Sequence, residues 1–472
     1  MTRISIDPIT RIEGHLKVEL EVEDGVIQSA RSSGALYRGL EKILEGRDPL
    51  DAQKITQRIC GVCPLAHSTA ASLCLDDALG IAADVPHNGV LLRNLIYAAN
   101  FLHNHILHFY HLALPDYIDP SVLAGESEAP LAQLISPGTQ AEDRRFTEQE
   151  NRRLVDNYVA ALTMRRKAQE MVALLGGKMP HDMAIVPGGV TFTPGLGELE
   201  AFRFRLDEMR EFVEGSYIPD VLLWVERYGD HLELGRTAAF LSFGAFPEEG
   251  GRVLPAGTLV GGEISEASWG KVAETVDSSW YAEDGEVPAL EKSEGYSWVK
   301  SPRFAGHPCE VGPAARAQVG LKGGGAELRT MLEDGLREAQ VAPEQLGSVA
   351  GRHLSRALEV RFLSGRMGAW LSQVDLGGPV ACAFDIPERA TGKGLTDAPR
   401  GALSHWIEIR EGKIGCYQVV SPTTWNASPR DREGNPGPLE QALAGTGVHG
   451  DGYTEAGRIV RSFDPCLACA VQ

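Results

Sequence analysis

Two Cys-x-x-Cys pairs are the residues of this 472-residue chain whose type and spacing point most directly to chemistry. The first pair is Cys60 and Cys63, and the second is Cys466 and Cys469, with only three residues following it. A cysteine thiolate is a strong ligand for soft and borderline metal ions. Because chain termini usually fray, a reactive pair so near the end indicates that a bound group holds it in place.

The spacing of the pairs leaves several kinds of site open. Structural zinc sites usually take their second pair from a loop of roughly 12–20 residues, whereas almost the whole chain separates these two. A redox-active pair should begin a helix that follows a strand, and neither pair shows this context clearly. Four thiolates from two pairs would suit zinc, an iron–sulfur cluster or nickel.

The residues around the two cysteine pairs favour a catalytic site over a structural metal site. His67 follows the first pair, Glu13 lies in the run Arg-Ile-Glu-Gly-His at 11–15, and Arg400 lies in the run Asp397 to His405. A structural zinc site needs no arginine, carboxylate or imidazole around its thiolates, whereas proton and electron transfer uses such groups.

Helices are the main elements predicted to position these residues. Apolar periodicity predicts helices from about residue 49, then over 91–114, 145–175, 198–227, 326–340 and 343–374. Alternation predicts a β-hairpin within 3–30, turning at 23–25, and another over 405–420, while 241–320 is expected to be irregular with some strands. We therefore predict a mainly α fold of the α+β class, a helical body with small β appendages. We expect residues 1–472 to form a single domain, because the metal site uses both ends of the chain.

Composition excludes several classes of partner. Acidic residues number 64 against 45 basic ones, which gives a formal net charge of −19 and argues against binding nucleic acid or an anionic membrane surface. The first residues contain no basic segment followed by an apolar one, so we expect no secretory signal there. Residues 91–114 are interrupted by Arg93, Asn94, Asn100 and four histidines, so we expect no membrane span.

Taken together, these motifs resemble the large subunit of nickel–iron hydrogenases over nearly the whole chain. The resemblance runs from residues 11–15 to Asp464-Pro465-Cys466-x-x-Cys469. It is closest to the uptake or respiratory group and its nickel–iron–selenium branch, with Cys466 at the selenocysteine position. Further matching segments are 38–41, 58–64, 108–111, 179–181, 308–313 and 424–426.

The resemblance implies a nickel–iron centre that cleaves H2 reversibly and heterolytically into protons and electrons. Cys60 and Cys466 would be terminal nickel ligands, and Cys63 and Cys469 would bridge to an iron carrying cyanide and carbon monoxide. Cys466, assisted by Arg400, would accept the proton, and Glu13 would relay it. An arginine hardly ever deprotonates, which makes Arg400 the weaker candidate for the base.

Other matching positions surround this centre. The resemblance implies that His67 hydrogen-bonds a bridging sulfur and that Arg400 and Thr423 donate to the cyanides, while Asn104 replaces a frequent aspartate. A magnesium-like ion, Mg2+ or Fe2+, would be held near the C-terminus by Glu41, the Val419 carbonyl and a terminal histidine, which is Gln472 here. Val62 and Leu112 match gas-channel positions. They are less bulky than the residues of hydrogen sensors, which favours turnover over an H2-sensing regulatory role, the alternative function.

The remaining cysteines predict a partner chain. Cys74, Cys309, Cys382 and Cys416 are too scattered to bind a cluster, so we expect buried structural thiols. A small subunit carrying iron–sulfur clusters must then remove the electrons, and the family has one. Through it, the chain would be periplasmic or membrane-associated, the alternative being cytoplasmic. The chain ends where processed family members end, which indicates a matured form or a gene without the C-terminal extension.

Overall fold

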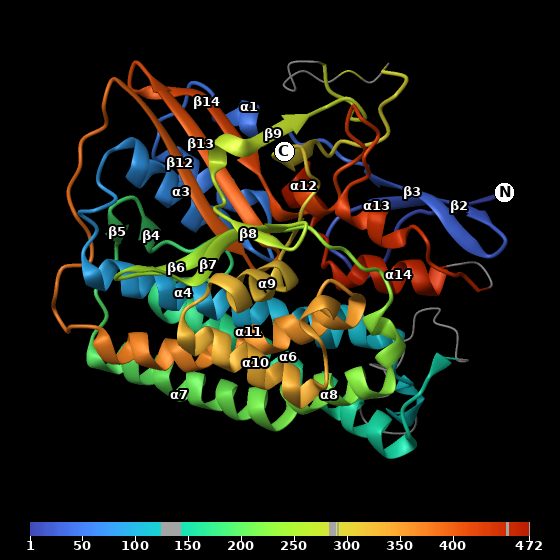
Figure 1. The fold of residues 1–472 in the computed structure, drawn as a ribbon. Helices are drawn as coiled ribbons and strands as arrows, with labels where there is room; N and C mark the ends of the chain where they lie inside the picture. Colours follow the sequence, from blue (N-terminus) through green and yellow to red (C-terminus); the bar gives the residue numbers. More distant parts are fainter. Residues whose placement is uncertain (124–142, 283–288, 290–291, 450–452, 472) are drawn as a thin grey trace.

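Long helices form one side of the molecule and small sheets the other (Figure 1). This computed structural model describes residues 1–123, 143–282, 289, 292–449 and 453–471. The predicted α+β class with a dominant helical part is confirmed. The helical side consists of α4 (His87–Ile106), α6 (Glu148–Gly176), α7 (Leu196–Phe212), α8 (Ile218–Arg227), α10 (Ala326–Ala339) and α11 (Val349–Gln373).

The predicted long helices are present, with two local departures. Thr147 caps α6 by accepting from the Glu150 N–H, and Gly177 ends it at a φ of 82°, as the sequence signals indicate. The helix predicted over 91–114 changes to π-helical geometry over Leu107–Ala113. The helix predicted over 198–227 is divided between α7 and α8 by a π-helical segment, Val213–Tyr217.

The N-terminal sheet is antiparallel and contains the predicted hairpin. Its strands are β1 (Thr2–Ile6), β2 (Leu16–Glu23) and β3 (Val26–Gly34). Asp24 and Gly25 join β2 to β3 with positive φ angles of 51° and 74°, the geometry of a two-residue hairpin turn.

More of the middle of the chain is regular than the sequence predicts. The segment 241–320, expected to be irregular with some strands, lies in a region that forms β6 (Phe240–Glu248), β7 (Gly251–Val260), β8 (Glu263–Ser265), β9 (Val272–Thr275), β10 (Ser301–Phe304) and β11 (Glu310–Val311). β11 pairs in parallel with β6, so the four-stranded sheet of β11, β6, β7 and β8 uses residues far apart in the chain. The helix α9 (Pro313–Gly323) that follows was also not predicted.

A three-stranded sheet near the C-terminus supports the first cysteine pair. Its strands are β12 (Arg389–Ala398), β13 (Gly401–Arg410) and β14 (Lys413–Val420), so the predicted hairpin gains one strand. Helix α3 (Pro64–Ala78) lies against β12 at Gly392 and Gly394. A Cβ at Gly394 would lie 2.0 Å from the Ala70 carbonyl oxygen, so only glycine permits this close approach.

Short elements complete the description. They are α1 (Leu40–Leu44), α2 (Asp51–Thr56), β4 (Ile185–Val186), β5 (Gly189–Val190), α12 (Pro422–Asn426), α13 (Pro438–Leu443), α14 (Tyr453–Ser462) and α15 (Leu467–Ala470). One apolar cluster of buried side chains extends from Ile6 to Val471 and so includes both ends of the described chain.

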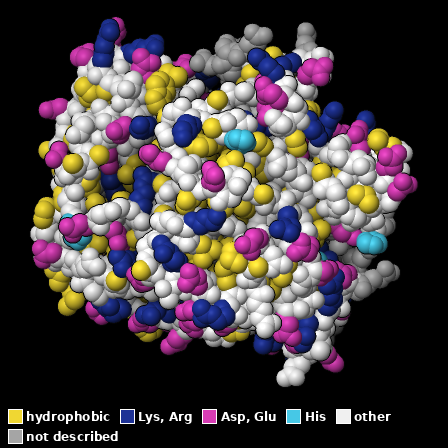
Figure 2. All heavy atoms as spheres, viewed as in Figure 1, with side chains coloured by type: hydrophobic (Ala, Val, Ile, Leu, Met, Phe, Trp, Pro, Cys, Tyr) yellow, Lys and Arg dark blue, Asp and Glu magenta, His cyan; other side chains and the backbone are white. Residues whose placement is uncertain are grey.

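The surface carries charges of both signs. On the face in Figure 2, acidic and basic side chains are interspersed with apolar ones. Within the described ranges, no helix has the length and apolar character needed to cross a lipid bilayer.

Candidate metal centre

The two cysteine pairs meet in one buried cluster. The sulfurs of Cys60, Cys63, Cys466 and Cys469 all lie within 4.8 Å of one another. The Sγ–Sγ distances are 3.4 Å for Cys60–Cys466, 3.5 Å for Cys63–Cys469 and 2.9 Å for Cys466–Cys469. Cys63 is the N-cap of α3 and Cys466 is the N-cap of α15. Each pair therefore does border a helix N-terminus, a context that was not apparent from the sequence.

Backbone pairing brings the two ends of the chain together. Glu13 and Cys466 form an isolated parallel β-bridge, in which the Leu467 N–H donates to the Glu13 carbonyl over 2.9 Å. Gly14 adopts a φ of +82°, and a Cβ there would lie 2.8 Å from the Leu467 Cβ. Glycine is needed here for both its conformation and its small size.

Buried ion pairs also stabilise this junction between the two ends of the chain. The Asp116 carboxylate accepts from Arg11 in the N-terminal segment and from Arg461 in α14, the latter over 2.6 Å and 2.9 Å. Asp116 and Arg461 are each about 1% exposed at the side chain. Removing either side chain would leave the charge of the other unpaired in the protein interior, which would destabilise the fold.

The Glu13 carboxylate faces the thiol cluster. The Cys466 thiol donates to Glu13 Oε2 over 3.1 Å, and the Ala468 backbone N–H donates to the same oxygen over 3.0 Å. Glu13 is only partly buried, whereas Cys466 is fully buried. The carboxylate therefore lies between the cluster and the surface of this chain.

Arg400 places a fixed positive charge beside the thiols. Its guanidinium donates to the Asp464 carbonyl over 2.9 Å, to the Asp464 carboxylate over 3.0 Å and to Asn104 Oδ1 over 2.8 Å. Burial alone would lower the pKa of Arg400, but the Asp464 carboxylate and the cysteine sulfurs outweigh it and raise the pKa. Asn104 Nδ2 in turn donates to the Val62 carbonyl over 3.2 Å.

A buried histidine contacts one sulfur of the cluster. His67 Nε2 lies 3.5 Å from the Cys469 Sγ, and His67 Nδ1 lies 3.1 Å from His405 Nε2. His405 Nδ1 is 2.7 Å from the Tyr417 hydroxyl. Burial lowers the pKa of His67 to about 4 and also lowers the pKa of His405, so both rings are neutral near pH 7.

Three further predicted residues lie nearby. Thr423 Oγ1 accepts from the Cys466 backbone N–H over 2.9 Å, and the Val62 N–H points at the Cys60 sulfur over 3.3 Å. The Leu112 carbonyl accepts from Arg11 over 2.7 Å. These contacts locate the three residues. Donation by Thr423 to the iron-bound cyanides, and a gas channel past Val62 and Leu112, stay predictions.

The protonation of the cluster suits a bound cation. Hydrogen bonds from neighbouring thiols lower the pKa of Cys60, whereas burial raises the pKa of Cys466 and of Cys469. In the protein alone, burial thus disfavours the thiolate forms of Cys466 and Cys469. A metal ion that replaces their protons would favour ionisation, and a set of four sulfur ligands suits soft or borderline metals such as nickel.

The second predicted metal site is partly described. The Val419 backbone N–H donates to Glu41 Oε1 over 2.7 Å, on the outer edge of β14. In an antiparallel edge strand, the N–H and C=O of one residue point to the same side, so the Val419 carbonyl faces Glu41 as well. The Lys300 ammonium lies 3.4 Å from Glu41 Oε2. Gln472 lies outside the described residues.

The four other cysteines are placed apart from the cluster. Cys74 and Cys309 are buried, and burial raises the pKa of both thiols. Cys382 and Cys416 are only half-buried, so the expectation of four buried thiols is wrong for this pair. Cys382 lies outside any helix or strand, and Cys416 lies in β14, the edge strand of its sheet.

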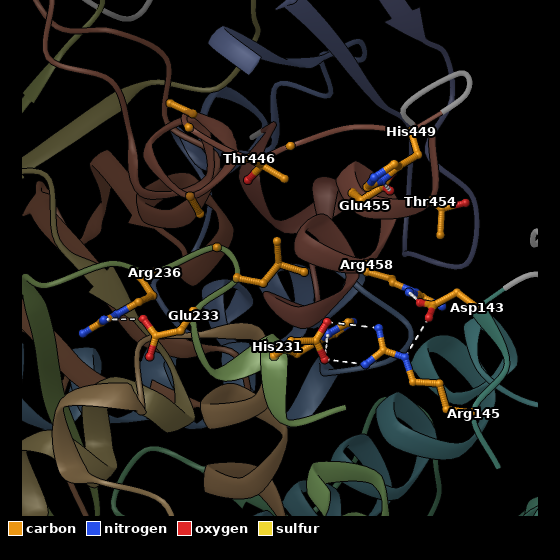
Figure 3. A pocket seen from close by; sticks show the side chains of 17 residues that line it. Asp143, Arg145, His231, Glu233, Arg236, Thr446, His449, Thr454, Glu455 and Arg458 are labelled. Atoms are coloured by element: carbon orange, nitrogen blue, oxygen red, sulfur yellow. Dashed lines mark hydrogen bonds and ion pairs between the residues drawn. The ribbon is translucent and has the colours of Figure 1, made fainter. Parts of the chain in front are cut away.

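A large surface pocket lies away from the thiols. It has a volume of about 740 Å³ and is lined by α13, α14 and the segments around residues 143–145 and 230–236 (Figure 3). Its arginines are paired with acids, Arg145 with Asp230, Arg236 with Glu233 and Arg458 with Asp143. The pocket therefore presents mostly neutralised charge and includes none of the predicted site residues.

Comparison with known proteins agrees with the geometry of the thiol site. A profile described as nickel-dependent hydrogenase matches residues 38–153 and 140–472, and a HoxL-like profile matches residues 3–33. The chain belongs to the nickel-dependent hydrogenase family. Its similarity to catalytic large subunits identifies this hydrogenase chain as such a subunit, an oxidoreductase acting on H2.

Individual relatives resemble this hydrogenase subunit over its full length. It is 40% identical to the periplasmic NiFeSe hydrogenase large subunit of Desulfomicrobium baculatum, over 99% of this chain and 94% of that protein. It is 34% identical to the hydrogenase-2 large chain of Escherichia coli K12, over 99% and 97% respectively. The reduced NiFeSe hydrogenase structure from D. vulgaris Hildenborough superimposes with a TM-score of 0.91 at 41% identity, covering 100% of both chains.

Some residues of the site were not singled out by their spacing. Asp464 and His405 lie within motifs that were noted for neighbouring residues, and only the fold shows that they support Arg400 and His67. Tyr417 and Lys300 carry no local signal, because each reaches its partner from a different strand or loop. Pairing of β13 with β14 could have placed Tyr417 near His405, because Tyr417 pairs with Ile407, two residues along β13 from His405.

Proposed function

We propose that this subunit cleaves H2 reversibly and heterolytically at a nickel–iron centre held by its four clustered thiolates. Cys60 and Cys466 would be terminal nickel ligands, and Cys63 and Cys469 would bridge to an iron bearing cyanide and carbon monoxide. When bound, such a centre supplies a Lewis acid that makes H2 acidic and an acceptor for its electrons. The single observation that carries this proposal is the buried four-sulfur cluster with Glu13 against Cys466.

The sulfur of Cys466 is the proton acceptor in this proposal. It lies at the N-terminus of α15 and 3.1 Å from Glu13 Oε2, so a proton taken up by the sulfur has an acceptor within hydrogen-bond distance. Glu13 then carries the proton outward, because it lies between the buried sulfur and the surface of the chain. The Ala468 N–H holds the receiving oxygen in place.

Arg400 has an electrostatic role in the same step. Three hydrogen bonds to Asp464 and Asn104 fix its guanidinium, which stabilises negative charge on the nearby sulfurs without giving up a proton. Arg400 and Thr423 are also the proposed donors to the cyanides. The predicted gas route past Val62 and Leu112 belongs to this proposal too.

A hard cation, Mg2+ or Fe2+, is proposed at Glu41 and the Val419 carbonyl. A carboxylate and a carbonyl oxygen are ligands that such ions prefer. Gln472 would supply an amide oxygen in place of the terminal histidine. Metal analysis of the purified enzyme tests this site, since Glu41→Gln should remove this ion while leaving nickel in place. Equal magnesium and iron content in both proteins would contradict it.

A small subunit with iron–sulfur clusters is the proposed electron acceptor. The described part of the chain holds one cluster of possible metal ligands, so a relay must come from another chain. The segment 36–50, which adjoins the site through contacts of Arg38 with the Ile59 and Ala468 carbonyls, exposes Leu36, Ile43 and Leu50. We propose this face as part of the contact. Export of the complex would follow the partner, with a periplasmic or membrane-associated location. The D. baculatum relative is named as periplasmic.

Infrared spectroscopy with a turnover assay tests the proposed function. The purified enzyme should show bands of iron-bound cyanide and carbon monoxide and should reduce a dye rapidly under H2. Absence of these bands, with zinc as the bound metal, would overturn the proposal. Bands with feeble turnover would instead support the H2-sensing alternative.

A further inference from the structure

A chain of hydrogen bonds leads from the metal centre into the β12–β14 sheet. It runs from the Cys469 sulfur through His67 on α3 and His405 on β13 to Tyr417 on β14. The residues are almost completely buried, with exposures of 1% for His67, 0% for His405 and 2% for Tyr417. Each of the four ring nitrogens has one partner, so the protons of the chain are ordered relative to one another.

Metal binding selects one order of these protons. A cysteine that ligates a metal is a thiolate and can only accept, so His67 Nε2 must carry the hydrogen that points at Cys469. With its hydrogen on Nε2, His67 accepts at Nδ1 from His405 Nε2, which lies 3.1 Å away. His405 Nδ1 is therefore an acceptor, and the hydrogen bond to it must come from the Tyr417 hydroxyl.

We propose that Tyr417 is a positioning residue for the nickel–iron centre, because its hydroxyl anchors the His405 ring, and His405 in turn holds His67 in place to donate to the Cys469 sulfur. This inference rests on the proposed function. The Tyr417 hydroxyl does not contact the Cys469 sulfur itself, and acts on it through the imidazoles of His405 and His67. A donor to a ligating sulfur withdraws electron density from it and so tunes the metals.

The fold holds this chain rigidly. Glycines in β12 let α3 approach the sheet closely, and a Cβ at Gly392 would lie 2.4 Å from the Cys74 carbonyl. This approach sets His67 beside His405, with ring centroids 5.4 Å apart. Tyr417 reaches His405 from the adjacent strand and meets its ring edge-on at 5.6 Å. Rotation of either imidazole ring would leave a buried polar atom unpaired, which is unfavourable.

Loss of the Tyr417 hydroxyl should alter the centre without removing it. In Tyr417→Phe, His405 Nδ1 loses its hydrogen-bond partner, so the His405 ring is held less firmly and in turn holds His67 less firmly. The Cys469 sulfur then receives less hydrogen bonding and donates more electron density. In the purified enzyme we expect the carbon monoxide band to shift to lower wavenumber, with the metal content unchanged.

Two further variants separate this role from simple packing. Tyr110→Phe is the matched control, because Tyr110 is also fully buried and its hydroxyl makes a hydrogen bond to Asp220. It should leave the band in place. In Tyr417→Phe/His405→Gln, the glutamine amide can donate to His67 Nδ1 without help from Tyr417, so the band should return toward its original position.

The outcomes distinguish the two proposals. If the unsubstituted enzyme lacks cyanide and carbon monoxide bands, the proposed function fails and this inference fails with it. If the bands are present and Tyr417→Phe leaves them unshifted, the inference alone is overturned. A shift in Tyr417→Phe that the added His405→Gln does not reverse would also overturn it, because packing rather than the hydrogen bonds of the chain would then be responsible.

Discussion

The Glu13 carboxylate lies 3.1 Å from the Cys466 sulfur, although 453 positions separate the two residues in the chain. A parallel backbone bridge between the same residues sets this distance, and Gly14 makes room for it. The proposed proton route and the proposed metal site therefore depend on one junction between the two ends of the chain.

Glu13→Gln should block proton transfer while keeping the metals. Glutamine retains an oxygen for the Ala468 N–H but cannot take a proton from Cys466. We expect H2-dependent dye reduction and hydrogen–deuterium exchange to fall by roughly 10²–10⁴-fold, the usual contribution of a positioned acid–base group. Infrared bands should persist. Glu23→Gln, at an exposed residue of β2, is the control, and exchange at the normal rate in Glu13→Gln would exclude the relay role.

Arg400→Lys should reduce turnover strongly. A lysine ammonium cannot reproduce the three directed hydrogen bonds to Asp464 and Asn104. We expect a loss of roughly 10²–10³-fold, the range found for removal of one electrostatic donor. Asn104→Asp is the companion variant, since it keeps an oxygen acceptor for Arg400 and should stay within a few-fold of the unsubstituted enzyme. Nickel content, measured in both, should be unchanged.

Cys469→Ser should prevent assembly of the metal centre. A serine hydroxyl is a much poorer ligand for a soft metal than a thiolate, so nickel content and the infrared bands should both be lost. Cys309→Ser makes the same chemical change at a buried thiol whose sulfur donates to the His307 carbonyl. That variant should retain nickel, and if both variants lost it equally, misfolding would explain the result.

Much of the site could be predicted from the sequence because its residues lie in short motifs. Such motifs contain the two cysteine pairs, Glu13, His67 and Arg400. The types of these residues limit the kinds of metal site and reaction that they could support. Asp464 was overlooked as the partner of Arg400, since a carboxylate next to a proline has no distinguishing pattern. The His405–Tyr417 contact depends on strand register, which local sequence specifies only weakly.

The fold was predictable where one periodicity dominates. Helix α6 carries its own capping box and terminal glycine, and the Asp24-Gly25 turn requires positive φ angles. The parallel pair of β11 with β6 was not predictable in this way, because β11 has only two residues, Glu310 and Val311. Its position is decided by contacts with distant elements. The π-helical segment Leu107–Ala113 likewise continues an apolar pattern that does not differ from that of an α-helix.

A buried glutamate should make stability depend on pH. Burial raises the pKa of Glu440 to about 7, although the carboxylate accepts from the Ser32 N–H and the Tyr296 hydroxyl, each over 2.9 Å. The folded chain thus binds this proton more tightly than the unfolded chain, where the pKa is near 4.5. The contribution to stability is fully present below about pH 4.5 and is lost as pH rises through about 7.

Glu440→Gln should remove this dependence, since the amide is neutral at every pH and its oxygen can keep both hydrogen bonds. Thermal unfolding of the purified enzyme should show a higher midpoint for the variant than for the unsubstituted protein at pH 8. The two midpoints should be similar at pH 5, because Glu440 is then protonated. Glu455→Gln, at a glutamate whose pairing partner His449 is 85% exposed, is the comparison. A variant that is less stable at pH 8 would show that the Glu440 charge contributes favourably to folding.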